Sequence, residues 1–521
     1  MRRGAGLWAL CLALVTTLLT ACSGDGGDDT VRLRVLAGPD LAVLAPLLEE
    51  LRDETGVDLR LDHRADAETK TPDRDNYDLA WLSSDRYLRL TDKSAIRGLQ
   101  RMPTMTSPVV IGLKPDVARK LRARVPGGRL TWADIADGAA TGTVRFGMAD
   151  PRHAGSGLAA LVGVATAAAG TGAALRPEDV SCDRLRGFRS GQTLTGDTGP
   201  ALVDSYVDHQ GEANALITYE SDLLALNATD RLDDRLEIVR PQDGMVLADF
   251  PLLLLNPAHR TAYDKVTQWL RRDSVQRQIM RHTLRRPVNT AVTRDPRLRE
   301  PVGNALFYPD QPAVVATLLA DYGDPDRRTT SRVVFLLDFS GSMRGTRMAA
   351  LREAFAGLSG ADLSASGKFT RFYRGERLTA VRFGGRVLEE KTVTVTGPRD
   401  LTALADTVSR GGYGDATAVW SALDHGYRTA ARELAADPDR SVSLVLMTDG
   451  ENNAGLSYAE FLRRHRALPA AVRDAVHTYP VHFGEADAGE LRRVAARTGG
   501  RMVDAAGSSL SEAFKEIRGC H

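Results

Sequence analysis

The first 300 residues alternate short apolar runs with amphipathic stretches. Strand-like runs lie at Val31–Leu36, Val57–Leu61 and Leu79–Leu82, and Ala42–Thr55 carries apolar residues at helical spacing. Strands that alternate with helices predict a mainly parallel sheet covered by helices. Two later apolar strands, Pro108–Leu113 and Phe250–Asn256, mark where we expect the chain to leave one lobe and return to it. The pattern predicts a two-lobed α/β domain over residues 31–300, with lobe 1 at about 31–107 and 250–300 and lobe 2 at about 108–249.

A second α/β domain is predicted over residues 331–521. Val333–Leu337 is continuously apolar, as is typical of a central parallel strand buried on both faces. Val442–Met447 repeats that pattern, and Val476–Phe483 is followed by a helical stretch at Ala488–Thr498. These elements predict a Rossmann-like, doubly wound sheet. Residues 301–330 hold four prolines around one short helical stretch and are interpreted as a semi-rigid linker.

Composition narrows the possible functions. Hydrophobic residues make up 43% and charged residues 26% of the 521, which is ordinary for folded protein. The 68 Lys and Arg nearly balance the 67 Asp and Glu. We therefore expect no binding of nucleic acid, which requires a strongly basic surface.

The N-terminus has the pattern of an export signal. Arg2 and Arg3 precede an apolar run over residues 7–19, which ends in Leu19-Thr20-Ala21-Cys22. This ending resembles the lipobox of bacterial lipoproteins. The resemblance implies cleavage after residue 21, lipidation of Cys22, a flexible tether over residues 22–30, and a lipid-anchored protein on the extracytoplasmic face of the cell membrane. The alternative is an uncleaved membrane anchor, but the run is short for a span of about 20 residues.

Two cysteines remain after the signal and the lipid site are set aside. Cys182 and Cys520 would both lie in an oxidising compartment. The sequence leaves open whether they form a disulfide or stay as free thiols, because their separation in space is unknown.

The first domain resembles the two-lobed bacterial extracellular solute-binding proteins in its order of elements and its lipobox. The resemblance implies a small-molecule solute between the lobes. Gly155-Ser156-Gly157 opens an apolar helix, and a helix start with free N–H groups is a physical anion site. The candidate ligand contacts are the residues at this helix start and in two loops after strands, namely Ser83, Ser84, Ser156, Gly157, Tyr219 and Glu220. The plainer reading is that Ser156 is a helix cap and Ser83-Ser84 a turn.

Oxygen-bearing side chains cluster after the predicted strands of the second domain. Asp338, Ser340 and Ser342 form a D-x-S-x-S pattern directly after the first strand, and Asp449 follows the strand Val442–Met447. Thr417 lies in a Gly-rich loop that opens another helix. Carboxyl ends of parallel strands share one edge of a sheet, so these side chains should converge. Oxygen-only ligands suit Mg²⁺, or Mn²⁺ or Ca²⁺, rather than zinc.

This constellation resembles the metal-ion-dependent adhesion site of von Willebrand factor A domains. The resemblance implies direct coordination by Ser340 and Ser342, participation of Asp338 and Asp449 directly or through water, and participation of Thr417 in one loop state. It also implies an open metal position that accepts a carboxylate from a protein partner.

A catalytic function is not expected. The sequence contains no G-x-S-x-G elbow and no H-E-x-x-H motif. Two binding functions remain. The first is a surface protein that binds an acidic side chain of a partner through its metal, in adhesion or assembly. The alternative is a solute receptor, or a transporter-type binding protein, whose second domain relays the ligand state to a partner.

Overall fold

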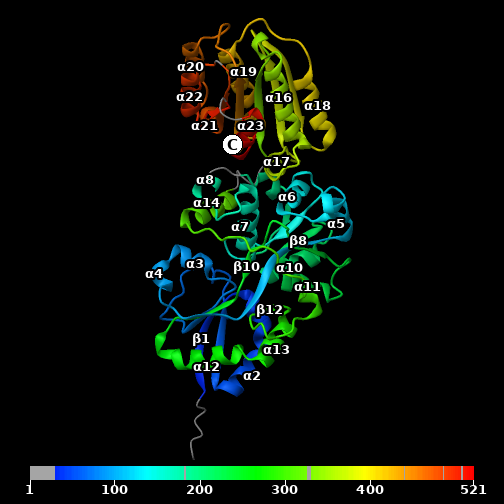
Figure 1. The fold of residues 1–521 in the computed structure, drawn as a ribbon. Helices are drawn as coiled ribbons and strands as arrows, with labels where there is room; N and C mark the ends of the chain where they lie inside the picture. Colours follow the sequence, from blue (N-terminus) through cyan, green and yellow to red (C-terminus); the bar gives the residue numbers. More distant parts are fainter. Residues whose placement is uncertain are drawn as a thin grey trace, which may run out of the picture.

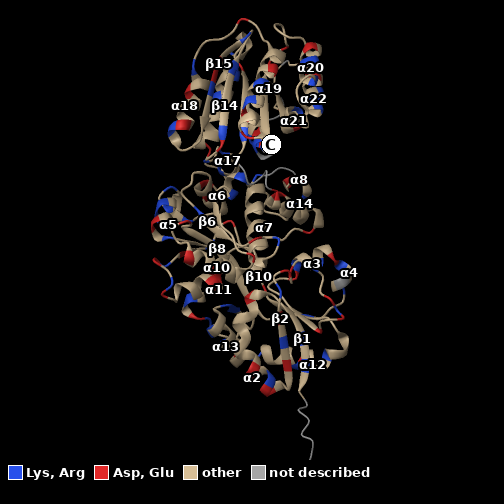
Figure 2. Cartoon of the chain, turned by 180° about the vertical axis from the view of Figure 1, so that it is seen from behind, with Lys and Arg blue, Asp and Glu red and all other residues tan. Residues whose placement is uncertain are grey.

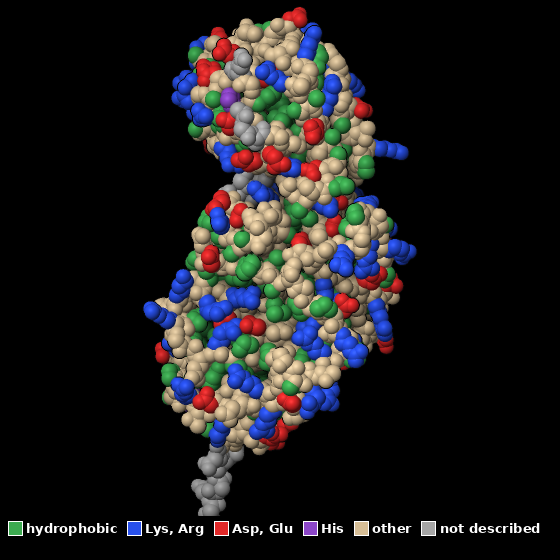
Figure 3. Space-filling model, in the orientation of Figure 1, with side chains coloured by type: hydrophobic (Ala, Val, Ile, Leu, Met, Phe, Trp, Pro, Cys, Tyr) green, Lys and Arg blue, Asp and Glu red, His purple; other side chains and the backbone are tan. Residues whose placement is uncertain are grey.

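The computed structural model describes residues 30–180, 184–324, 330–438, 440–484, 486–505 and 509–520. Cys22 and Cys182 lie outside these residues, as does the side chain of Cys520, so lipidation and disulfide formation stay predictions. Figure 1 shows two lobes and a C-terminal domain stacked along one axis, with β1 (Val31–Ala37) in the lobe at one end. Figure 3 shows a waist between the second lobe and the C-terminal domain. Figure 2 shows acidic and basic residues intermixed along the whole stack.

Lobe 1 is built on a five-stranded sheet of order β2-β1-β3-β11-β4. β1 pairs in parallel with both of its neighbours, and β11 is antiparallel to β3 and β4. The other strands are β2 (Val57–His63), β3 (Leu79–Trp81), β4 (Arg101–Pro103) and β11 (Pro251–Leu254). The helices that pack on or beside this sheet are α2 (Ala45–Thr55), α3 (Arg86–Thr91), α4 (Lys93–Ile96), α12 (Arg260–Leu270) and α13 (Asp273–Thr283).

Lobe 2 has a sheet of order β10-β5-β8-β6-β7, with β9 and β12 also paired to β5. Its strands are β5 (Met105–Leu113), β6 (Phe146–Met148), β7 (Gln192–Leu194), β8 (Ala215–Tyr219), β9 (Glu237–Val239), β10 (Leu247–Ala248) and β12 (Arg286–Pro287). Its helices are α5 (Pro115–Arg122), α6 (Trp132–Ala140), α7 (Gly155–Ala169), α8 (Pro177–Val180), α9 (Arg186–Arg189), α10 (Gly199–Asp208) and α11 (Glu220–Asn227). Within the described residues of either domain, no helix has the length and apolar character needed to cross a bilayer.

The segments that cross between the lobes hold the two non-glycine residues with positive φ among those described. Phe250 has φ 42° and Leu284 has φ 53°. Such conformations cost roughly 1–3 kcal/mol and persist only where the surroundings enforce them. At Phe250 the carbonyl accepts a hydrogen bond from Thr104 Oγ1 (2.7 Å), and Thr104 lies in a third crossing segment, between β4 and β5. The crossing segments at Thr104 and Phe250 are therefore tied together.

Residues 312–323, within the predicted linker, form a helix that belongs to the packing of lobe 2. In α14 (Pro312–Gly323), Val314, Val315 and Leu318 are buried in the same core as α7. The hydroxyl of Tyr322 accepts a hydrogen bond from Gln192 Nε2 at 3.0 Å. This helix is thus a fixed part of the first domain rather than a spacer.

The C-terminal domain is a six-stranded sheet of order β15-β14-β13-β16-β17-β18, with only β15 antiparallel. Its strands are β13 (Arg332–Asp338), β14 (Arg377–Phe383), β15 (Val387–Thr394), β16 (Val442–Thr448), β17 (Val476–His482) and β18 (Val503–Asp504). Its helices are α16 (Thr346–Ala356), α17 (Ala365–Thr370), α18 (Pro398–Ser409), α19 (Val419–Ala436), α20 (Tyr458–Arg466), α21 (Ala470–Ala475), α22 (Ala488–Arg497) and α23 (Leu510–Cys520).

Both faces of β13 are buried, as its apolar run predicts. Val333, Phe335 and Leu337 face a core with α16, α18 and α23, whereas Val334 and Leu336 face a core with α19, α20 and α22. Alternate strand residues point to opposite faces, so only a strand covered on both sides keeps this composition.

The amino-terminal edge of this sheet faces the first domain. Lys368 of α17 pairs with Asp134 of α6 at 2.7 Å, and Arg371 pairs with Asp137. Directly before β14, the backbone N–H of Arg374 donates to the carbonyl of Ala140 at 2.8 Å. Because β13 and β14 start at this junction, their carboxyl ends face away from the first domain.

Candidate functional site

The carboxyl edge of the third sheet brings together all five predicted metal ligands. Asp338 ends β13, Ser340 and Ser342 follow in the next turn, and Asp449 follows β16. The Oγ atoms of Ser340 and Ser342 lie 2.9 Å apart, and the Ser342 hydroxyl donates to Asp449 Oδ1 at 2.9 Å. A Cβ placed on Gly450 would lie 3.7 Å from both Ser342 Oγ and Thr417 Oγ1. We call these five residues the metal edge.

Backbone pairing fixes the three loops of the metal edge. Ser340 bridges to Gly414, whose N–H donates to the carbonyl of Phe339 at 2.9 Å. In the third loop the side chain of Asn453 accepts from the N–H of Thr417 at 2.7 Å, and the N–H of Asn453 donates to the carbonyl of Thr417 at 3.0 Å. The site is therefore held before any ligand arrives.

Burial and charge make this edge suited to a cation. Asp338, Ser340, Thr417 and Asp449 are buried, whereas Ser342 is exposed on the open side. Burial raises the pKa of Asp338 to about 6, and the charge of Asp449 adds to that rise. The donor set is hard oxygen only, so the residues present fit Mg²⁺, Mn²⁺ or Ca²⁺. Among the described residues, no group of three or more His, Cys, Asp or Glu forms an alternative metal centre.

Two neighbours of the metal edge are missing from the sequence prediction. Thr448 Oγ1 donates to Asp338 Oδ2 at 2.8 Å and so orients that carboxylate. Arg347 on α16 pairs with Asp449 Oδ2 and is about one-third exposed. Thr448 directly precedes Asp449, which is a usable signal, whereas nothing in the sequence marks Arg347. Asp415, two residues before Thr417, is exposed and stands apart from this network.

The predicted solute contacts of the first domain lie between the lobes, but most of them are buried in internal bonds. The hydroxyl of Tyr219 donates to Ser83 Oγ at 2.7 Å, and both side chains are buried. Ser84 accepts from the N–H of Arg86 at 3.3 Å, as in a simple turn. Gly157 packs against the carbonyl of Ala149, where an added Cβ would collide.

Glu220 is part of a buried ion network rather than a free ligand group. It is 1% exposed, and Arg286 donates to its two oxygens at 2.7 and 3.0 Å. Arg240 adds a further hydrogen bond at 2.8 Å. The carboxylate is therefore fully engaged by its own domain.

Two acidic residues of lobe 1 occupy helix starts of lobe 2. The Glu68 carboxylate accepts a hydrogen bond from the N–H of Ser83 at 2.8 Å. It also lies against Gly155 at the start of α7, so closely that any side chain at position 155 would collide with it. Asp40 lies in the same way against Gly199 at the start of α10. A helix start favours a negative charge, and at Gly155 the carboxylate of Glu68 lies where we predicted a bound anion. Sequence reasoning missed both residues.

The surroundings of these carboxylates are strongly desolvated. Burial raises the pKa of Glu68, and burial together with the nearby charges of Asp222 and Glu68 raises the pKa of Asp40 to about 8. Arg285 is the buried cation that opposes this rise. The hydroxyl of Ser156 lies buried at the same helix start without a hydrogen-bond partner.

A cavity between the lobes is smaller than most solute sites. It measures about 20 Å³ and is bounded by Glu68, Ser84, Tyr219 and Tyr308, among others. Ligand pockets usually measure about 300–1,000 Å³, whereas one water needs roughly 10–15 Å³. This cavity therefore has room for about one water.

Comparisons with known proteins divide the chain at the same place. Residues 33–283 match the family model of the bacterial extracellular solute-binding proteins, and residues 333–516 match that of the von Willebrand factor type A domain. Among curated proteins, none matches the chain.

Solved structures resemble one domain or the other at low identity. A Bordetella ferric binding protein is 13% identical, with 56% of this chain and 96% of that chain covered and a TM-score of 0.36. A periplasmic thiamin binding protein is 12% identical, with 56% and 95% covered and a TM-score of 0.41. A von Willebrand factor type A protein from Catenulispora acidiphila is 20% identical, with 37% of this chain and 42% of that chain covered and a TM-score of 0.28.

Proposed function

Because this chain carries a bacterial solute-binding domain followed by a von Willebrand factor A domain, we propose that it is a binding protein of the cell surface, not an enzyme. The metal edge would hold Mg²⁺, or Mn²⁺ or Ca²⁺, and the metal would bind an acidic side chain of a protein partner. The observation that carries the proposal is the convergence of two buried aspartates and three hydroxyls on one edge. Only Ser342 is exposed there, so a partner would approach from its side.

The closed state of the first domain supports a scaffold role for it. Glu68 and Asp40 fill the helix starts that an anionic solute would use, and the cavity beside Glu68 holds about one water. A solute-receptor function would require the lobes to separate and these carboxylates to leave. We therefore rank metal-dependent partner binding above solute reception.

Metal binding is tested with Mn²⁺, which is observed directly by electron paramagnetic resonance. We expect one Mn²⁺ per chain, and at least tenfold weaker binding in D449N because a buried ligand charge is lost. D415N is the matched control, since it removes the same charge from an exposed neighbour and should bind as the wild type does. Equal affinity in D449N and the wild type would refute the proposed site.

Partner chemistry is tested on a surface coated with poly-glutamate. The full chain should bind in Mg²⁺, lose binding in EDTA, and regain it when Mg²⁺ is restored. Poly-glutamine is the uncharged control. Retention in EDTA, or equal retention on poly-glutamine, would show that a metal–carboxylate contact is not the mode of binding.

We also propose that the protein is anchored by lipid at Cys22 on the extracytoplasmic face. Expressed in a bacterial host fed labelled palmitate, the wild type should incorporate the label and C22A should not. Equal labelling of both proteins would refute the anchor at Cys22.

A further inference from the structure

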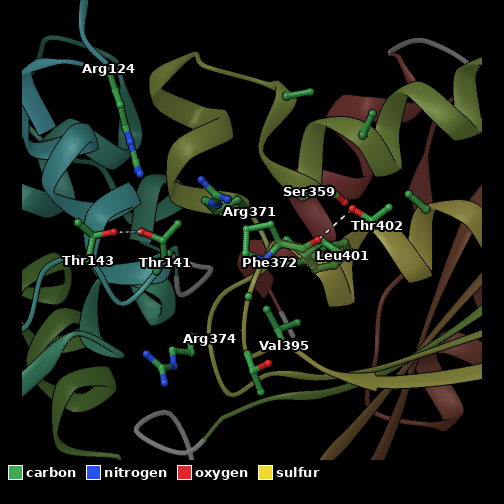
Figure 4. Close-up of a pocket in the computed structure, with 17 residues that line it drawn as sticks. Arg124, Thr141, Thr143, Ser359, Arg371, Phe372, Arg374, Val395, Leu401 and Thr402 are labelled. Atoms are coloured by element: carbon green, nitrogen blue, oxygen red, sulfur yellow. Dashed lines mark hydrogen bonds between the residues drawn. The ribbon is translucent and has the colours of Figure 1, made fainter. Parts of the chain in front are cut away.

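A large cavity lies at the junction of the two domains (Figure 4). It measures about 650 Å³, within the range of small-molecule sites. Residues after α6, such as Thr141 and Thr143, line one side, and residues of the C-terminal domain, such as Phe372 and Leu401, line the other. We call this space the interdomain cleft. It lies at the amino-terminal edge of the third sheet, opposite the metal edge.

The charge in the interdomain cleft is entirely positive. Arg124, Arg371 and Arg374 line it, and none of its described lining residues is acidic. Arg124 and Arg374 are exposed, and the structure records no hydrogen bond or ion pair for either guanidinium. The nearest carboxylates are already engaged, since Asp137 pairs with Arg371 and Asp400 binds the backbone at the start of α18. An anion in this space would therefore meet uncompensated positive charge.

Two buried polar atoms in the lining also have no partner. Arg371 donates to Asp137 through one terminal nitrogen, but its Nε is buried and makes no hydrogen bond. The hydroxyl of Ser359 is likewise buried without a partner. Unsatisfied buried polar atoms are uncommon in folded proteins, because the loss of their hydrogen bonds to water is then uncompensated. A bound acceptor would satisfy the Nε of Arg371.

The opposite part of the cleft is apolar. Phe372, Val395 and Leu401 contribute to it, together with Ala405 of α18. In Figure 4, Arg124 and Arg374 lie on the side of Thr141 and Thr143, and Leu401 lies on the other side. The cleft thus offers cations at one end and a hydrocarbon surface at the other.

We propose that the interdomain cleft binds a small organic anion with an apolar body. Its acidic group lies among Arg124, Arg371 and Arg374, and its apolar part covers Phe372, Val395 and Leu401. Because both domains line the cleft, the ligand also strengthens their contact. The site is independent of the metal edge.

The probe for this proposal is 1-anilinonaphthalene-8-sulfonate, whose fluorescence rises on binding, with N-phenyl-1-naphthylamine as its uncharged counterpart. The wild type should bind one sulfonate per chain. R124E/R374E should weaken that binding at least tenfold while changing the affinity for the neutral probe less than twofold. Both arginines are exposed and free of recorded side-chain bonds, so thermal unfolding of this variant should match that of the wild type.

Two further variants separate the cleft from other surfaces. R277E converts one exposed arginine of α13 in lobe 1 to glutamate, which is half of that charge change, and should leave sulfonate binding unchanged. A405W fills the cleft and should weaken both probes. Equal sulfonate affinity in R124E/R374E and R277E would overturn the proposal, and so would a folded A405W that binds both probes like the wild type.

Discussion

Glu220 provides the sharpest test of whether a predicted solute contact is instead a structural residue. It is 1% exposed, and its partner Arg286 is 2% exposed. Glu220→Gln keeps the size of the side chain but removes the charge that balances two guanidiniums. Breaking a buried ion pair costs about 3–5 kcal/mol, because the remaining charge is left buried and unpaired. In a domain of this size each kcal/mol lowers the melting temperature by about 2–4 °C, so we expect a loss of about 6–20 °C.

The assay is thermal and urea unfolding followed by tryptophan fluorescence. Three of the four described tryptophans, Trp81, Trp132 and Trp269, are buried in the first domain and report on it. Glu237→Gln is the matched control, because in its pair the side chain of Arg122 is 42% and that of Glu237 is 35% exposed, and such a pair should contribute at most about 1 kcal/mol. If E220Q unfolds like E237Q, the network does not hold the domain together, and a solute-contact role for Glu220 becomes tenable again.

Three other predictions address the remaining features. The pKa of Asp40 is raised to about 8, so the folded form keeps a proton that the unfolded form releases above about pH 4. Stability should therefore fall as the pH rises from 4 through 8, and D40N should flatten that part of a melting-temperature profile. An equal slope in D40N and the wild type would contradict this prediction. Leu336→Ala leaves a cavity in the core and should lower the free energy of unfolding in urea by about 2–5 kcal/mol. Adding G426A should recover part of this loss, since a Cβ at Gly426 would lie 2.9 Å from Leu336 Cδ1 and so extend into that cavity. No recovery would mean that the cavity collapses without the added methyl group. Arg347 pairs with Asp449 and would compete with a metal for that carboxylate. R347A should therefore bind Mn²⁺ several-fold more tightly in the resonance titration. Weaker binding would show that Arg347 supports the site instead.

The metal edge could be predicted from sequence because its signals are local. Asp338, Ser340 and Ser342 follow a strand whose burial on both faces is visible in the apolar run Val333–Leu337. Parallel strands bring their carboxyl ends to one edge, so adding Asp449 needed only a second buried strand. Five oxygen-bearing side chains, spread over more than 100 residues, were thus expected at one edge by a rule of topology.

The lobe interface could not be predicted in the same way. Glu68 lies in a loop after β2, and nothing in its sequence surroundings links it to Gly155. Their contact depends on how far the lobes close, which is a tertiary property. The same holds for α14, whose prolines indicate a linker although Val314, Val315 and Leu318 bury it against lobe 2. Local composition describes a segment, but not the surface on which it packs.

The metal edge and the N-terminus lie at opposite ends of the molecule, and this arrangement limits which partners the metal edge can contact. β1 begins in the lobe at one end (Figure 1). The carboxyl ends of β13 and β14 face away from the first domain, because the amino-terminal edge of their sheet contacts it. With the predicted anchor at Cys22, a tether of nine residues extends at most about 30 Å. This is less than the diameter of either domain, which scaling with chain length gives as roughly 40–50 Å. The tether is too short for the molecule to fold back fully onto its own membrane. The acidic group that it binds would then belong to a molecule standing well clear of the bilayer or to an opposing surface, and shortening the tether would matter less than removing a domain.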